Sequence, residues 1–306
     1  MKRIKEELVY KNHRIISYKW INEGVKKIGT VQIFHGMAEH ILRYENFIEF
    51  LTDKGFVVIG HDHIAHGNSA KEVSKIGIIE DEDFMEAAMN VCKLVREHYK
   101  KEFDKNSSYL FSHSMGSMLA HRYIEIYPND FNKVILCGTD INSIKYSFGM
   151  KVFKSLMQKK GSISYPKILD SLTMKPFNKK FKEDHPLFGW LSVNKENITT
   201  YEKDSLCGAK FPTNYYYSLA KLLVDTGKDE NLKLINNTTQ ILLLSGKDDP
   251  VTNFSKSTVK LHKRFKKFGI EVVSEIYYNA RHEILKEKKE VREMVYEDIY
   301  NFLTAN

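Results

Sequence analysis

Residues 108–117 read SYLFSHSMGS, an apolar run that ends in a short segment of small residues. Apolar residues continue through 115–127 at helical spacing, so the stretch predicts a strand that passes directly into a helix. A sharp turn at such a junction lifts the hydroxyl of Ser114 clear of the sheet. The strained turn accepts only small residues two positions away on either side, here Ser112 and Gly116. Taken alone, the stretch is equally compatible with a turn that caps a helix.

Similar apolar runs recur along the chain and alternate with amphipathic helical patterns. The runs are EELVY, RIISYKWI, TVQIFHG, FVVIGHD, KVILCGTD, QILLLSGKDD and VVSEIYYNARHE. The first two predict an opening hairpin, and the others are continuous enough to be parallel strands buried on both faces. Helical patterns cover 83–101, 115–127, 254–268 and 284–303. This alternation predicts an α/β fold with a mostly parallel central sheet flanked by helices.

The rhythm of strands and helices breaks between residues 143 and 213. This segment holds four of the six prolines, no clear strand pattern and many apolar residues. Because the strand rhythm resumes at Gln240, we expect a helical insertion into one sheet. The predicted organisation is a core formed by 1–142 and 214–306, with 143–213 as a helical cap, called the cap segment below.

Composition limits the class of protein. The 306 residues, 42% of them hydrophobic, suffice for one large domain with an insertion. No apolar run approaches the roughly 20 residues that span a bilayer, and the charged first residues give no export signal. Three widely spaced cysteines argue against a disulfide framework or a zinc site. We therefore expect a cytoplasmic protein.

The formal net charge of +8 allows nucleic-acid binding as one interpretation. No zinc-finger, RNA-binding or Arg-rich signature accompanies the charge, so we favour solvated lysines on helix faces and expect no nucleic-acid partner. A weak, transient attraction of the cap segment to anionic lipid surfaces remains compatible with the lysine excess.

A serine hydroxyl becomes a nucleophile only when a base takes its proton, and the base needs a carboxylate to orient it. In this architecture the acid and the histidine follow the serine in that order, each at the end of a later strand. Asp249 and His282 occupy those positions. Asp248 is a local rival for the acid, and Asp249-Pro250 is also a common turn start.

Acyl transfer also needs hydrogen-bond donors for a developing oxyanion. One should be the backbone N–H of Met115, directly after the serine. VQIFHGMAEH offers the second in a loop after an early strand, where Gly36 permits close backbone approach. We assign this second donor to the amide of Met37.

The segment HDHIAHG (61–67) raises a metal site as a rival chemistry. The metallo-hydrolase spacing H-x-H-x-D-H would need an aspartate at position 65, where the chain has alanine. No other His/Asp cluster obviously completes a site. We favour a packed loop and expect neither a metal nor a cofactor.

Together these segments resemble the monoacylglycerol lipase and lysophospholipase branch of the α/β-hydrolase fold. The matching motifs are HGMAEH with Arg43-Tyr44, HDHIAHGNS, SHSMG, SGKDDPV and NARHEI, in family order. The resemblance implies Ser114 as nucleophile, Asp249 as orienting acid, His282 as base, and backbone donors at Met37 and Met115. The family pattern has a glycine three residues before the acid. Gly246 has this spacing to Asp249, which favours Asp249 over Asp248. Ser112 departs from the usual glycine.

The sequence thus predicts a cofactor-independent serine ester hydrolase with a small lipid-like ester, a monoacylglycerol or a lysophospholipid, as substrate. Two alternatives stay open. A proline-preferring serine aminopeptidase would need an acidic feature near the cap segment, for which Glu183, Asp184 and Glu202 are candidates. A non-catalytic binding module of the same fold is the other alternative, although such modules often lack one of the three side chains present here.

Overall fold

The computed structural model describes residues 1–80, 83–141, 143–226 and 228–305. Its strands form one sheet of eight in the order β1-β2-β4-β3-β5-β6-β7-β8. The strands are β1 (Lys2–Tyr10), β2 (His13–Ile21), β3 (Gly29–Phe34), β4 (Phe56–His61), β5 (Ser108–His113), β6 (Lys133–Cys137), β7 (Gln240–Gly246) and β8 (Val272–Tyr277). Each falls on one of the apolar runs in the sequence.

The sheet is mostly parallel, as predicted. Strands β1 and β2 form the expected antiparallel hairpin, and β2 also pairs antiparallel with β4. From β4 to β8 every neighbouring pair is parallel. Strands β3, β4, β5 and β6 are buried at every residue, which explains why their sequences are continuous apolar runs rather than alternating ones.

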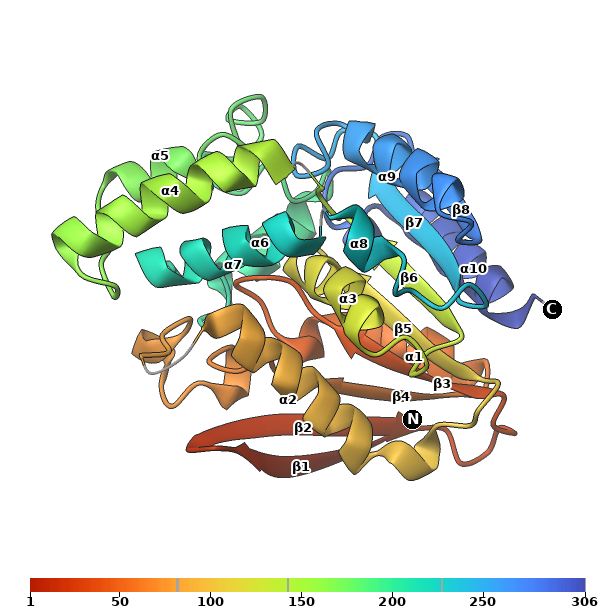
Figure 1. The fold of residues 1–306 in the computed structure, drawn as a ribbon. Helices are drawn as coiled ribbons and strands as arrows, with labels where there is room; N and C mark the ends of the chain where they lie inside the picture. The colour runs from red at the N-terminus through yellow and green to blue at the C-terminus, as the bar shows by residue number, and fades with distance from the viewer. Residues whose placement is uncertain (81–82, 142, 227, 306) are drawn as a thin grey trace.

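Helices cover both faces of the sheet (Figure 1). The α-helices of the two layers are α1 (Glu45–Asp53), α2 (Phe84–His98), α3 (Met115–Ile126), α7 (Thr213–Thr226), α8 (Asp229–Leu232), α9 (Lys256–Lys267) and α10 (Lys289–Thr304). Short 3₁₀ turns are η1 (Ile41–Tyr44), η2 (Gly67–Ser69), η3 (Val73–Lys75), η4 (Lys100–Glu102) and η5 (Ile284–Lys286). One hydrophobic core includes side chains of α1 and α10, and the other includes those of α2, α3, α7 and α9.

The cap segment contains α4 (Ser143–Lys160), α5 (Ile168–Leu172) and α6 (Lys195–Lys203), and no strand within the described residues 143–213. Helix α4 packs against α7, which in turn packs against α2 and α3. Figure 1 shows α4 and α5 on the side of α7 that faces away from β1 and β2. We propose that 143–213 forms a cap on a core of 1–142 and 214–306; residues 142 and 306 themselves lie outside the described residues. None of the described helices is long and apolar enough to cross a membrane.

Candidate active site

Ser114 lies in a sharp turn between β5 and α3. Its backbone has φ 54° and ψ −123°, in the left-handed range of φ that a residue with a side chain seldom adopts. The turn is held because the Ser114 amide donates to the carbonyl of Cys137 at 2.9 Å, and the amide of Ser117 donates back to the Ser114 carbonyl at 2.9 Å. The strain therefore persists where neighbouring strands fix the backbone, and Ser114 faces the cavity described below.

The two small residues that flank Ser114 have different reasons to be small. A Cβ on Gly116 would lie 2.3 Å from the carbonyl oxygen of Phe34 and 2.4 Å from that of His35, so α3 approaches β3 too closely for any side chain. Ser112 is fully buried, and its hydroxyl donates to the carbonyl of Ile135 at 2.7 Å. The serine in place of the usual glycine thus leaves no unsatisfied buried group.

His282 and Asp249 meet beyond the ends of β8 and β7. Nδ1 of His282 lies 3.0 Å from Oδ2 of Asp249, and both side chains are buried. The other carboxylate oxygen of Asp249 accepts a hydrogen bond from the amide of Val251 at 2.8 Å. Asp248 is exposed, and its backbone amide donates to the carbonyl of Ala280 at 3.0 Å. The geometry therefore pairs His282 with Asp249.

The second ring nitrogen of His282 is available. Nε2 is buried and has no hydrogen-bond partner among the residues that the structure describes, Ser114 included. Both Ser114 and His282 line the same cavity. The ring is packed between His113 and Trp190, whose ring centroids lie 4.6 and 5.1 Å away. Such a ring can accept a proton when the serine hydroxyl rotates toward it, and contacts of this kind are often loose before substrate binds.

Met37 and Met115, the two predicted oxyanion donors, both belong to the wall of this cavity. Met37 follows β3, Met115 is the first residue of α3, and both line the cavity. Neither amide donates a hydrogen bond to another residue within the described ranges. The first turn of a helix leaves its N–H groups unsatisfied, so the Met115 amide suits a negatively charged oxygen.

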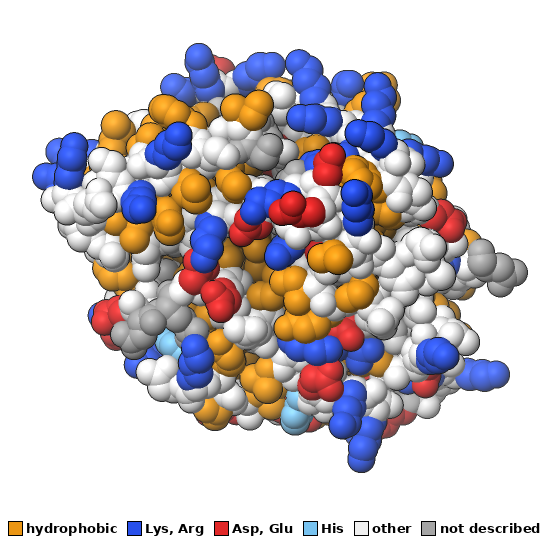
Figure 2. Space-filling model, in the orientation of Figure 1, with side chains coloured by type: hydrophobic (Ala, Val, Ile, Leu, Met, Phe, Trp, Pro, Cys, Tyr) orange, Lys and Arg blue, Asp and Glu red, His pale blue; other side chains and the backbone are white. Residues whose placement is uncertain are grey.

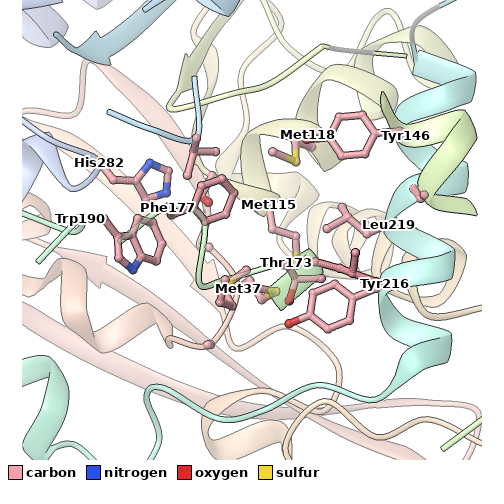
Figure 3. Close-up of a pocket in the computed structure, with 18 of the residues that line it drawn as sticks. Met37, Met115, Met118, Tyr146, Thr173, Phe177, Trp190, Tyr216, Leu219 and His282 are labelled. Carbon is pink, nitrogen blue, oxygen red and sulfur yellow. The ribbon is translucent and has the colours of Figure 1, made fainter. Parts of the chain in front are cut away.

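The cavity has a volume of about 240 Å³ and runs between the core and the cap segment. Its lining is mainly apolar, with contributions from Met37, Met115, Met118, Tyr146, Phe153, Phe177, Trp190, Tyr216, Leu219 and His282. Figure 3 shows His282 and Trp190 at one end, and Tyr216 and Leu219 on α7 at the other. A slender apolar chain fits such a space, with its polar end near Ser114.

The histidine-rich segment forms a second cluster away from the cavity. His35, His61, His63 and His66 are fully buried, and burial lowers the pKa of His61 to about 3 and that of His66 to about 4. Sγ of Cys92 lies 3.8 Å from Nε2 of His61 and 3.9 Å from Nδ1 of His63. These three atoms lie close enough together to hold a metal ion.

Cys92 corrects one point of the sequence analysis, which found no residue to complete a site beside the histidines. The cysteine lies on α2, and only the packing of α2 against the sheet brings it there. None of His61, His63 and Cys92 lines the cavity. The aspartate of the segment is structural, because Asp62 accepts hydrogen bonds from the amides of Ile41 at 2.9 Å and Asn68 at 2.7 Å.

A buried charge network behind the loop of Met37 was missed by the sequence analysis as a functional element. Arg43 lies between Glu39 and Glu283, with Nη1 2.7 Å from Oε2 of Glu39 and Nη2 3.0 Å from Oε2 of Glu283. All three side chains are almost completely buried. The spacing of Glu39 and Arg43 is an i,i+4 pair, but nothing in the sequence signals that Glu283, so far along the chain, joins them.

Known proteins resemble this chain over most of its length. The family model described as "Serine aminopeptidase, S33" matches residues 26–289. Human monoglyceride lipase is 26% identical over 281 residues, which cover 92% of this chain and 83% of that protein. A probable lysophospholipase L2 from Haemophilus influenzae is 23% identical over 95% of this chain and 88% of that protein.

Solved structures share the fold over the whole chain. A thermostable carboxyl esterase from Bacillus coagulans, crystallised with glycerol, superposes with a TM-score of 0.87 at 23% identity and covers 99% of this chain and 98% of that one. A lipase solved in an open form reaches a TM-score of 0.88 at 24% identity, with 99% of this chain and 100% of that chain covered. At these identities the likeness establishes the arrangement of elements.

Proposed function

We propose that this chain, which belongs to the serine aminopeptidase S33 family of α/β-hydrolases, is a serine hydrolase of lipid-like carboxylic esters. The observation that carries the proposal is the shared cavity of Ser114 and His282, with Asp249 holding the ring from behind. The lipase, lysophospholipase and esterase relatives support carboxylic ester hydrolysis as the reaction class.

In the proposed mechanism the hydroxyl of Ser114 rotates toward Nε2 of His282 and attacks the ester carbonyl as the ring takes its proton. The tetrahedral oxyanion accepts hydrogen bonds from the amides of Met37 and Met115. The protonated ring, stabilised by Asp249, then gives the proton to the departing alcohol. Water enters, loses a proton to His282 and releases the acid from Ser114 by the same route.

The cavity supports a lipid-like acyl group over a small polar one. Its walls are mostly apolar, and methionines at 37, 115 and 118 supply adaptable surface near Ser114. We infer that the acyl chain lies between α7 and the cap segment, with the ester carbonyl at Ser114 and the alcohol beside His282. A monoacylglycerol or a lysophospholipid satisfies both requirements.

The aminopeptidase alternative has less support. Recognition of a free amine needs an unpaired carboxylate in the cavity, and neither Glu183, Asp184 nor Glu202 lines it. Asp184 is paired with Arg281, and Glu202 with His185 at 3.4 Å. The acidic side chains that do reach the cavity, Glu39 and Glu283, are both bonded to Arg43.

We also propose transient contact of the cap segment with lipid surfaces. On α4, Ile144 and Phe148 are 83% and 70% exposed. Figure 2 shows lysine and arginine side chains interspersed with hydrophobic ones over this face of the molecule. Exposed apolar side chains beside lysines suit an interface between acyl chains and anionic headgroups.

The test is a substrate panel with a covalent probe. We expect turnover of p-nitrophenyl esters and of monoacylglycerols or lysophosphatidylcholine, no cleavage of aminoacyl-proline amides, and labelling by a fluorophosphonate that disappears in Ser114→Ala. Cleavage of the amides in preference to every ester would favour the aminopeptidase. Tight ligand binding without labelling of the folded wild-type chain would favour the binding module.

A further inference from the structure

Glu39 occupies an unusual place, because its carboxylate lies directly behind the loop that carries Met37. Oε1 of Glu39 accepts hydrogen bonds from the amide of Gly36 and from the hydroxyl of Tyr44, each at 2.7 Å. Nδ1 of His113 lies 3.3 Å from the same oxygen. A Cβ on Gly36 would lie 2.7 Å from Oε1, so the loop and the carboxylate are in close contact.

The second oxygen of Glu39 is directed toward positive charge. Oε2 lies 2.7 Å from Nη1 of Arg43 and 3.6 Å from Nζ of Lys286. Burial alone would raise the pKa of Glu39, but Lys286, His113 and Arg43 outweigh burial and hold that pKa well below its ordinary value. Glu39 is therefore an ionised acceptor whose two oxygens have different partners. Oε2 faces the cations of Arg43 and Lys286, and Oε1 accepts from the loop amide of Gly36.

His113 extends the contact to the base. It is the residue before Ser114, and its Nε2 lies 3.1 Å from the carbonyl oxygen of His282. Since the atoms that face both ring nitrogens are acceptors, each contact needs a proton on the ring nitrogen, and a neutral ring makes one of them at a time. A neutral His113 therefore donates either to Glu39 or to the carbonyl of His282.

The loop itself is strained and held from both sides. Ala38 has φ 57°, a left-handed conformation that a residue with a side chain adopts only when its surroundings impose it. Its carbonyl accepts from the hydroxyl of Tyr201 and the amide of Gly208 on the cap side, both at 3.0 Å. On the core side the corresponding contact is the one between Glu39 and the amide of Gly36.

We propose that Glu39 is a positioning residue of the reaction centre, whose carboxylate sets the place of the Met37 amide by holding the amide of Gly36. The inference rests on the proposed ester hydrolysis. A purely electrostatic role would involve only Oε2, the oxygen that faces Arg43 and Lys286. Arg43 also has Glu283 as a second carboxylate partner. Of the groups that face Oε1, Gly36 and His113 line the cavity of the proposed reaction centre. Displacement of a catalytic group by about 1 Å can cost on the order of 10² in rate.

The test uses Glu39→Gln with a matched control. Glu125 is another carboxylate that is 2% exposed, but it lies on α3 beside Arg122 and does not line the cavity. In Glu39→Gln the one side-chain oxygen is drawn to Arg43 and Lys286, so the NH2 group faces the Gly36 amide. We therefore expect kcat to fall by about 10- to 100-fold with KM changed less than about threefold, as for a group that acts in the transition state. Glu125→Gln should leave kcat within about twofold of wild type.

A second readout separates positioning from general damage. A trifluoromethyl ketone forms a tetrahedral adduct on Ser114 whose oxyanion needs the Met37 amide, whereas a monoalkyl glycerol ether binds without forming one. In folded Glu39→Gln we expect the ketone's inhibition constant to rise by about the factor lost in kcat, and the ether's to stay unchanged. Equal losses for both inhibitors would mean a merely structural role and overturn the inference.

Glu39→Asp guards against a variant that fails to fold. It keeps the negative charge beside Arg43 but is one methylene too short to reach both Arg43 and Gly36, so kcat should still fall. Wild-type kcat in either folded variant contradicts the positioning role while leaving the proposed function intact. A wild-type chain with no ester turnover and no Ser114-dependent labelling would contradict the proposed function instead.

Discussion

The proposed reaction centre and the histidine cluster both form at the carboxyl ends of strands, and both are dense in residues that can do chemistry. The first gathers Ser114, Asp249 and His282, and the second gathers four histidines and Cys92. They differ in access. Ser114 and His282 line the cavity, whereas every member of the histidine cluster is fully buried and none lines it.

The difference shows that reactive residue types form a binding or catalytic site only where their side chains reach a space that a ligand can enter. In the histidine cluster Nε2 of His35 accepts from the amide of His63 at 2.9 Å. Nδ1 of His61 and Nε2 of His66 are buried without a partner among the described residues, but neither histidine lines the cavity. Nε2 of His282 is also without a partner among the described residues, but the side chain of His282 lines the cavity. An unpaired, buried nitrogen that faces a cavity costs stability and is expected where function requires it.

The largest effect should come from Ser114→Ala. Without the nucleophile we expect ester turnover to fall by about 10⁴-fold or more, because only oxyanion stabilisation and binding remain. Steady-state hydrolysis of a p-nitrophenyl ester measures the loss, and thermal unfolding checks that the fold is kept. Removal of the Ser114 hydroxyl breaks no hydrogen bond among the described residues, so the free energy of unfolding should change little. Retained turnover would place the chemistry elsewhere.

Next in size is the pair Asp249→Asn and Asp248→Asn. An asparagine at 249 cannot accept from Nδ1–H of His282 as the carboxylate does, so kcat should fall by about 10³- to 10⁴-fold. The exposed Asp248 should tolerate the same change within about threefold. If Asp248→Asn were the crippling variant and Asp249→Asn the benign one, the acid assignment would be wrong.

The histidine cluster should instead control acid stability. Its histidines have folded pKa values below the unfolded value near 6.5, about 3 for His61 and about 4 for His66, because burial disfavours the charged ring. Their contribution is fully present above pH 6.5 and is lost as pH falls toward the folded pKa. At pH 5.5 each such histidine costs about 1.4 kcal/mol relative to pH 8.

Urea unfolding at pH 8 and 5.5 measures this loss, with His61→Phe as the comparison. The variant should lose about 1.4 kcal/mol less free energy of unfolding than wild type between the two pH values, a tenfold difference in the folding equilibrium. Equal losses in the two proteins would mean that His61 is charged in the folded state.

The smallest effect should come from metal chelation. EDTA is expected to leave ester turnover within about twofold of the untreated enzyme, because His61, His63 and Cys92 do not reach the cavity even if they hold an ion. Turnover in EDTA-treated and zinc-supplemented samples measures this. Loss with EDTA and recovery with zinc would reverse the roles assigned to the two clusters.

The candidate site residues could be proposed from the sequence because they sit at element boundaries. A buried parallel strand is a continuous apolar run, so the ends of β5 and β7 could be found from the sequence alone, and the residues Ser114 and Asp249 with them. The place of Cys92 beside His61 and His63 could not be predicted, because contacts between α2 and β4 depend on helix packing. The same holds for the network of Glu39, Arg43 and Glu283, in which residues 39 and 283 meet only in the folded chain.

The amino-acid sequence by itself determined the α/β order of elements and the tight turn at Ser114, because these follow from the local hydrophobic pattern and from the small residues at 112 and 116. It also fixed the order of Ser114, Asp249 and His282 along the chain. Tertiary structure alone decided which polar cluster opens into a cavity, which aspartate faces His282, and what holds the loop of Met37. The physical reason is that burial, direction and charge pairing are set by contacts between distant segments, which leave no periodic pattern in the chain.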